Sequence, residues 1–446
     1  MSTQRGRWLP NQLIHCSLAA VAIAALAALP ARAQAPVERG AGTGELTLET
    51  AVQTALMHSP RLAALDAHSE ALEAVPSQVS ALPDPELSLN ALNLPTDTFN
   101  LDQEPMTQMQ IALSQRIPFP GKRKLKRTVA EHEARSARAG VEEQRDALTG
   151  AVRAAWWRLF SFDRALEIVE QNQELLRDLI KIAETKYAVG KGLQQDVLLA
   201  QLELSRLLDR EARLKGRRRS AQAELNALLD RPPDRSVLLA RSPPNVRLPE
   251  LPAEAVLLGR AAESRHLLTV HRDLLEAADS RLALAKRDVY PDFRLGAGYG
   301  VRQGNDPIRG DRPDFFSVMF SFNLPLYFGS KQSKAIDQRS SERTQRKYAL
   351  SDVLRSVEAQ ITRHLAAYDA AREQVLLLDT AIIPQAQQTV AAMLAAYQVN
   401  EVDFLNVVNG QLTLYNAQIN YWEALAEAKR SLAGLAAAVG TEALYE

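Results

Sequence analysis

The strongest constraint on this sequence is a segment that occurs twice. Residues 187–201 read YAVGKGLQQDVLLAQ and residues 397–411 read YQVNEVDFLNVVNGQ, and Tyr, Val, Val and Gln recur in register at an offset of 210 residues. Each copy lies in the middle of a long stretch in which apolar residues have helical spacing. A fixed internal period indicates that the chain consists of two copies of one structural unit.

Three other pairs of segments repeat in the same order, namely residues 47–62 with 252–267, 83–94 with 291–301, and 111–122 with 318–331. Between the two copies, residues 232–252 hold six prolines, which break helices and are typical of a linker. We therefore expect repeat 1 at residues 34–231, a linker at 232–252 and repeat 2 at residues 253–446.

Each repeat is expected to contain one long helical hairpin. Residues 122–231 contain no proline, and two of their glycines, at positions 190 and 192, can take the positive φ that reverses a chain. The first helix would be ~100 Å long at ~1.5 Å per residue. The second hairpin is expected at residues 330–440, with a kink near Pro384. Its turn has Asn400 where the first has Gly190, and Asn tolerates the left-handed conformation well.

Ahead of each hairpin we expect a helix and then a pair of β-strands, at residues 84–117 and 291–326. Apolar and polar residues alternate there, which marks strands with one apolar face. Strands of about 10–13 residues suit a membrane crossing as tilted strands. Four strands cannot close a barrel, and an open edge in lipid leaves backbone groups unsatisfied, so several copies must share one barrel. The apolar face, with Leu113 and Phe320, is expected to meet lipid.

Residues 1–33 are typical of a secretory signal peptide. Arg5 and Arg7 precede an apolar core at residues 17–29, and a small-residue cleavage site, ARA, ends at Ala33. The core is too short to span a bilayer. Cys16 is the only cysteine and precedes the core, so we do not expect lipidation. Export and a balanced charge exclude nucleic acid as a partner.

The sequence shows no pattern typical of catalysis or metal binding. EHE at residues 131–133 places neighbouring side chains on different helix faces, and we interpret it as a solvated helix surface. We therefore expect no enzyme, no catalytic residue, no cofactor and no metal ligand. KRKLKR, at residues 122–127, leaves two interpretations open: binding of anionic lipid head groups at the inner leaflet, or an ordinary charged helix face.

The order of signal peptide, helix, strand pair and hairpin with a Y-x-V-G tip, followed by the same order again, resembles the TolC-type outer-membrane efflux proteins. RIPFPGKR, at residues 116–123, is most similar to the heavy-metal branch of this family, the cobalt–zinc–cadmium and copper–silver components. The resemblance implies an α+β membrane protein in the outer membrane of a Gram-negative bacterium. It implies a homotrimer whose twelve-stranded β-barrel, four strands per chain, is continuous with a periplasmic α-helical barrel.

The resemblance also implies a function as the exit duct of a tripartite efflux pump. The partners would be a periplasmic adaptor (membrane fusion) protein, an inner-membrane transporter of the RND type and outer-membrane lipid. Heavy-metal cations are the expected cargo, with drug efflux or type I protein secretion as the alternative. A structural periplasmic tether is disfavoured because it needs no strands. Cargo and gating trigger cannot be identified from this chain, since such pumps select cargo upstream.

Functional residues are assigned by matching positions to the family. Adaptor docking falls on the hairpin tips, at Val189, Gly190, Val399 and Asn400, although these residues are equally compatible with a plain turn. The two aspartates that ring the closed periplasmic entrance of TolC correspond here to Asn406 and Asn409. Asp196 holds the position of Asn406 in the first repeat. Stabilisation of the helix dipole is an equally good role for Asp196.

We predict that the mature protein begins at Gln34 with a free amino group. Ala31 and Ala33 fill the small positions of the cleavage site, whereas cleavage after Ala35 would leave Pro36 first, which the peptidase disfavours. N-terminal sequencing of the exported protein tests this. An acylated chain that starts at Cys16 would contradict it.

Overall fold

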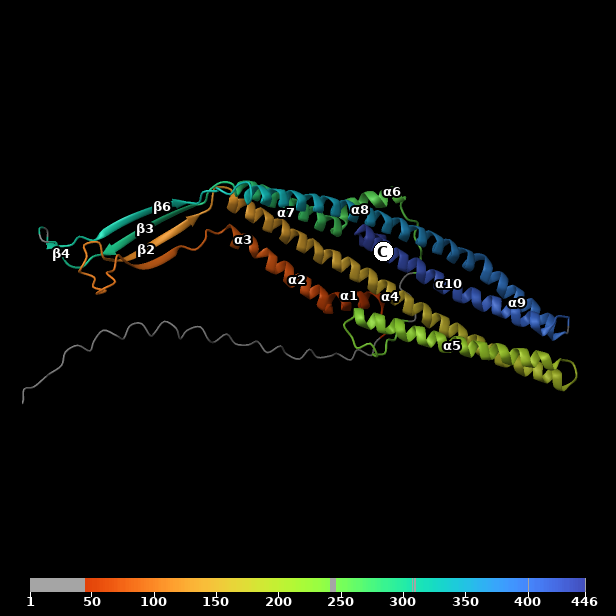
Figure 1. The fold of residues 1–446 in the computed structure, drawn as a ribbon. Helices are drawn as coiled ribbons and strands as arrows, with labels where there is room; N and C mark the ends of the chain where they lie inside the picture. The colour runs from red at the N-terminus through yellow and green to blue at the C-terminus, as the bar shows by residue number, and fades with distance from the viewer. Residues whose placement is uncertain (1–44, 241–245, 307, 309, 400, 446) are drawn as a thin grey trace, which may run out of the picture. The chain divides into compact units, whose positions relative to one another are not determined.

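The computed structural model describes residues 45–240, 246–306, 308, 310–399 and 401–445. The predicted signal peptide, residues 1–33, and Asn400 lie outside the described residues, as does part of the predicted linker. The first half contains α1 (Leu48–His58), α2 (Pro60–Glu73), α3 (Val75–Ser80), β1 (Glu86–Leu92), β2 (Gln108–Ile117), α4 (Lys122–Ala188) and α5 (Gln194–Leu228) (Figure 1).

The second half repeats this order with local differences. It contains α6 (Glu254–Ser264), α7 (His266–Arg287), β3 (Phe293–Val301), β4 (Asn305–Asp306), β5 (Gly310–Asp311), β6 (Phe315–Phe322), α8 (Gln332–Leu377), a π-helical segment (Leu378–Ile382), α9 (Ile383–Gln398), α10 (Phe404–Val439) and a 3₁₀ turn (Glu442–Leu444). The helical hairpins and strand pairs fall within the ranges predicted from the sequence.

Where one helix was predicted ahead of each strand pair, the structure has three in the first half and two in the second. Ser59 ends α1, and its side chain accepts the amide hydrogen of Leu62, so it also caps α2. Pro60 occupies the first turn of α2, a position that proline favours. The sequence pattern alone missed this break because apolar spacing continues through it.

The predicted kink near Pro384 takes the form of a π-helical segment. Five residues, Leu378–Ile382, follow α8, and Pro384 lies in the first turn of α9. Proline removes one backbone donor and its ring crowds the preceding turn, so a helix that continues through it widens locally.

Two tryptophans on α4 anchor the largest hydrophobic core. Trp156 and Trp157 are fully buried, and Trp156 stacks on Phe160 with ring centroids 5.1 Å apart. The indole of Trp156 donates to the carbonyl of Leu46 (3.1 Å), and that of Trp157 donates to the hydroxyl of Tyr445 (2.8 Å). Residues from the beginning and end of the described chain are thus fixed to the middle of α4. Burial of each ring contributes about 4–6 kcal/mol of hydrophobic stabilisation.

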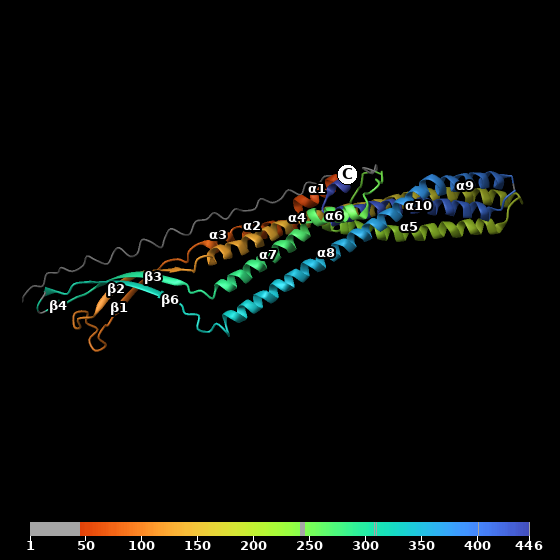
Figure 2. The same ribbon diagram turned by 90° about the horizontal axis from the view of Figure 1, so that it is seen from above.

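The two long hairpins pack side by side through an interface with a polar layer (Figure 2). Gln411 on α10 donates to the side-chain oxygen of Asn172 on α4 (2.8 Å). Both side chains lie beside a cluster of buried apolar residues from α4, α5 and α10. Gln173, a polar residue on the same helix as Asn172, is also buried and donates to Glu211 on α5 (2.7 Å). Paired polar groups in a helix seam fix the register of the helices.

The strands form one antiparallel sheet in the order β1-β2-β3-β6. The central β2–β3 pair joins the two halves, with Met109 opposite Val301 and Ile117 opposite Phe293. The strands have 7, 10, 9 and 8 residues, so most are shorter than the predicted 10–13. No helix in the described part of the chain combines the length and apolar character needed to cross a membrane.

One buried ion pair supports the start of α7. Arg265 has a side-chain exposure of 8% and donates to Glu143 on α4 (2.7 Å), whose second carboxylate oxygen accepts the amide hydrogen of Leu267 (3.0 Å). Burial raises the pKa of Glu143, although the charge of Arg265 and the bond from Leu267 oppose this. The carboxylate thus accepts from Nη2 of the buried guanidinium and from a helix amide, while Nε and Nη1 of Arg265 have no hydrogen-bond partner among the described residues.

We predict that Glu143→Ala destabilises the protein by about 3–5 kcal/mol, because it leaves Arg265 buried without its partner. The neighbouring Glu142→Ala serves as the control, since Glu142 is half-exposed and lies 3.7 Å from Arg145. Thermal unfolding followed by circular dichroism compares the two. Equal unfolding midpoints for both variants would contradict the prediction.

Candidate functional site

The two hairpin tips use the same turn. At the first tip, the amide of Lys191 donates to the carbonyl of Lys186 (2.8 Å), and at the second tip the amide of Glu401 donates to the carbonyl of Ala396 (2.9 Å). These bonds are related by the 210-residue offset of the repeat, and both close the last turn of a helix. The two copies have therefore kept this backbone hydrogen bond.

Two of the candidate docking residues are valines whose side chains are exposed. Val189 and Val399 are 63% and 65% exposed. Gly190 has φ +73° with open space around it, and a side chain at Gly192 would come within 2.9 Å of the Lys186 side chain. Glycine is thus required at 190 by conformation and at 192 by space. Asn400 lies outside the described residues.

The tips differ in what surrounds their tyrosines. Tyr187 is 50% exposed, whereas its counterpart Tyr397 is 5% exposed. The ammonium group of Lys186 donates to the carbonyl of Tyr397 (2.5 Å) and lies 3.9 Å from its ring centroid, and the ring of Phe404 packs against that of Tyr397 with centroids 5.4 Å apart. Within one chain, therefore, only the tyrosine of the second tip is covered.

The gate candidates occupy two different places. Asn406 and Asn409 are both exposed and line one groove of about 390 Å³ between α9 and α10, together with Met393 and Thr413. Asp196 lies in the first turn of α5 and is half-buried. Burial raises the pKa of Tyr397, and the charge of Asp196 raises it further. The structure therefore brings the two amides together and places the carboxylate beside the tip tyrosine.

The sheet has two chemically distinct faces. Cross-strand rows such as Leu113, Ala297 and Val318 make one face apolar. The opposite face carries rows such as Ser88, Ala112 and Gly298, and Gln110 lies over Gly298, where a side chain would come within 3.0 Å of it. The proposed lipid-facing residues Leu113 and Phe320 share the apolar face and are exposed.

An ionic cluster joins the sheet to the helices. Asp292, just before β3, accepts hydrogen bonds from Arg116 (2.9 Å), Lys122 (2.9 Å) and the amide of Phe119 (3.0 Å). Although burial acts to raise its pKa, these hydrogen bonds hold the pKa of Asp292 below its usual range. Lys122 also lies 3.4 Å from Asp288. The cluster was missed from the sequence, although charged residues recur beside the strand ends in both halves.

This cluster removes one residue of KRKLKR, at residues 122–127, from the candidates for binding lipid head groups. Lys122 is buried and committed to Asp288 and Asp292, so it cannot hold a lipid head group. Lys124 and Lys126 are exposed and make no ion pair with any residue that the structure describes. Their positions are 200° apart around α4, so they face different directions.

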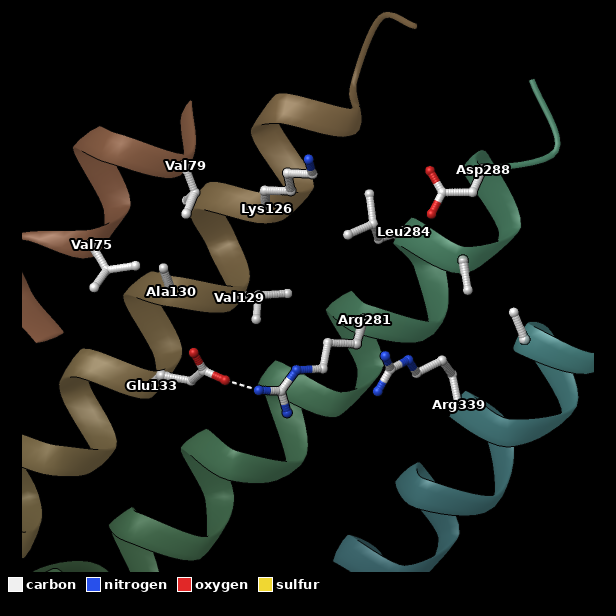
Figure 3. Close-up of a pocket in the computed structure, with 12 residues that line it drawn as sticks. Val75, Val79, Lys126, Val129, Ala130, Glu133, Arg281, Leu284, Asp288 and Arg339 are labelled. Atoms are coloured by element: carbon white, nitrogen blue, oxygen red, sulfur yellow. Dashed lines mark hydrogen bonds and ion pairs between the residues drawn. The ribbon is translucent and has the colours of Figure 1, made fainter. Parts of the chain in front are cut away.

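Next to the cluster, four helices line a hollow of about 360 Å³ (Figure 3). Side chains from α3, α4, α7 and α8 converge on it, and its charged lining comprises Lys126, Glu133, Arg281, Asp288 and Arg339. Figure 3 shows Glu133 paired with Arg281 across the hollow, with the guanidinium group of Arg339 beside that of Arg281. Burial lowers the pKa of Arg281, and the charge of Arg339 lowers it further.

The interpretation of EHE as a solvated surface was wrong for two of its three residues, His132 and Glu133. His132 bonds to Asp273 on α7 (3.0 Å), and Glu133 pairs with Arg281. Both side chains join α4 to α7, which the sequence could not reveal because their partners lie about 140 residues away. Within the described residues, no group of three or more His, Cys, Asp or Glu side chains is placed to hold a metal ion.

Comparison with known proteins gives consistent matches. The family described as Outer membrane efflux protein matches residues 51–231 and 257–441. The cobalt-zinc-cadmium resistance protein CzcC of Cupriavidus metallidurans is 22% identical over 391 residues, which cover 86% of this chain and 88% of that protein. These matches confirm the family resemblance seen in the sequence.

Solved structures share the fold. A structure of CusC, described in terms of folding and transmembrane channel formation, superposes with a TM-score of 0.74 at 15% identity and covers 89% of this chain and 92% of its own. The outer membrane protein VceC of Vibrio cholerae gives 0.71 at 19% identity, with 90% and 97% covered.

We predict that the unmodified protein is only weakly blocked by multivalent cations added from the tip side. The Asn406→Asp, Asn409→Asp double variant should be blocked strongly, because paired carboxylates attract such ions and amides do not. Single-channel recordings in planar bilayers measure the block.

Asn416→Asp is the matched control, because Asn416 lies on the same helix but bonds to Arg210 on α5 (3.1 Å). Strong block of the unmodified channel that the double variant leaves unchanged would place the gate elsewhere.

Proposed function

Because the chain belongs to the outer membrane efflux protein family, we propose that it is the exit duct of a tripartite efflux system. It lies in the outer membrane of a Gram-negative bacterium and has a large periplasmic part. The family consists of channel proteins rather than enzymes. In the proposed system, the duct works with a periplasmic adaptor and an inner-membrane transporter of the RND type.

One observation carries the proposal: a two-faced sheet with open edges is attached to two long helical hairpins. In lipid, each unpaired backbone group of an edge strand costs several kcal/mol. Three copies would supply twelve strands, close the sheet into a barrel and remove the edges. The polar face of the sheet then lines water, and the helical hairpins extend the wall into the periplasm.

The hairpin tips are the proposed docking points for the adaptor. Val189 and Val399 project at the ends of matching turns, so each chain presents two similar apolar points to a partner. The groove with Asn406 and Asn409 is the proposed periplasmic gate, and Asp196 beside Tyr397 is its proposed counterpart on the first hairpin.

For the cargo, we propose heavy-metal cations, on the strength of the similarity to a cobalt-zinc-cadmium resistance protein. Drug efflux or type I secretion is the alternative. In either case the chain acts as a conduit without a dedicated metal cage, and the pump upstream selects the cargo.

The hollow below the sheet would then face the channel. Arg294 lies on the polar side of β3, and Asp292 precedes it by two residues, just before the strand. Asp292 bonds to Lys122, and Lys126 follows Lys122 on the same side of α4. Side chains from four neighbouring helices converge on the hollow. We assign it to the channel side because Lys126, which lines it, lies on the same side of α4 as the Lys122 that bonds to Asp292.

We predict that purified protein migrates as a heat-modifiable trimer and forms channels in planar bilayers. Lys126→Glu should make these channels more selective for cations. The substitution changes the charge by two units, which at ~8 Å in water contributes roughly 1 kcal/mol, or about a sixfold change in local ion concentration. Reversal potentials in a salt gradient measure the shift.

Lys124→Glu makes the same charge change two residues away on another face of α4, and it should leave selectivity unaltered. A protein that stays monomeric and forms no channels would refute the proposed function. Channels that respond to Lys124→Glu but not to Lys126→Glu would refute the assignment of the channel-facing side.

A further inference from the structure

The two halves of the sheet carry matching residues, and only half of their contacts can form within one chain. Ser114 on β2 stands opposite Gly296 on β3, where repeat 1 meets repeat 2. In the repeat, Ser321 on β6 corresponds to Ser114, and Ser88 on β1 corresponds to Gly296. Yet β1 and β6 occupy opposite edges of the sheet, so these two serines cannot meet in one copy.

The charged residues beside the strand ends also occur in both halves, and only one of the two pairs forms within a chain. Lys122 and Asp292 form a pair in which the lysine side chain is 6% exposed (2.9 Å). Their counterparts by motif are Lys331, in GSK after β6, and Asp84, in PD before β1. Both counterparts are exposed, and neither forms an ion pair with a residue that the structure describes.

We infer that β6 of one copy pairs with β1 of the next copy in the register of the β2–β3 pair, with Ser321 opposite Ser88 and with Lys331 bound to Asp84. This inference rests on the proposed trimer and specifies its strand contact. The occupant of each free edge is thus a second copy of this chain.

The chemistry of the two edges supports this register. The proposed register places Phe320 of one copy opposite Leu89 of the next, so an apolar row continues between the copies on the apolar face of the sheet. It places Asn323 opposite Glu86 and so puts polar groups on the polar face. A shift by one residue would bring the apolar face of one strand against the polar face of the other, which a membrane penalises strongly.

Disulfide cross-linking tests the register directly. Opposed residues in an antiparallel pair have Cα atoms about 4.5–5.5 Å apart, within the range that a disulfide spans. The Ser88→Cys, Ser321→Cys double variant should therefore yield covalent dimers and trimers on boiled, non-reducing gels after mild oxidation in membranes. The mature protein adds no background, because Cys16, the only cysteine, lies in the predicted signal peptide.

The matched control is the Ser88→Cys, Ser317→Cys double variant. Ser317 lies on the same face of β6 but four residues from Ser321, which corresponds to ~13 Å along a strand. This variant should show at least tenfold less cross-linked product. Equal cross-linking of the two variants, or cross-linking of the control alone, would overturn the register.

The ion pair is tested by charge exchange. Lys331→Asp and Asp84→Lys should each lower the temperature at which trimers dissociate on gels, and the double variant should recover part of that loss. Single effects that simply add in the double variant would overturn the pair. Heat-modifiable trimers without the expected cross-link would overturn the register alone, whereas the absence of trimers would overturn the proposed function.

Discussion

The backbone groups at the two edges of the sheet govern the rest of this structure. Strands β1 and β6 each leave one side without a partner in the described chain, and hydrocarbon offers no water to take its place. Within one chain, the β2–β3 pair satisfies the backbone groups where the two repeats meet, but the outer edges of β1 and β6 stay unpaired. The long hairpins have the same need, since the tyrosine of the first tip is half-exposed while that of the second is covered.

Because the chain consists of two copies of one unit, the unpaired sheet edges and the uncovered hairpin tip can both be covered by a neighbouring chain. A repeated unit carries complementary edges by construction, because the contact between its two copies within a chain can recur between chains. The matching turn bonds at the two tips show how closely the copies agree. The agreement ends where proline and local packing intervene, as at the π-helical segment before α9.

Features with a period or a local chemical requirement could be predicted from the sequence. The alternation of the strands, the glycine turn at 190 and the hairpin ranges depend on neighbouring residues only. Features that depend on distant partners could not. Asp292 lies 170 residues from Lys122, and His132 lies 141 from Asp273, so charge pattern alone led to a solvated interpretation that was wrong. For the candidate gate, the sequence could place Asn406 and Asn409 on one face, but not the groove with Met393 that they share.

The unequal tips have a mechanical consequence. Within a chain, Lys186 clamps Tyr397 through both its carbonyl and its ring, whereas the residue that corresponds to Lys186 in the second repeat is Ala396, which has no group to clamp a tyrosine. Around a closed ring of three copies, the tips would therefore form three stiff blocks joined by three more compliant seams. Such a ring would open at the three contacts between neighbouring copies, while the contact between the two tips of each chain stays closed.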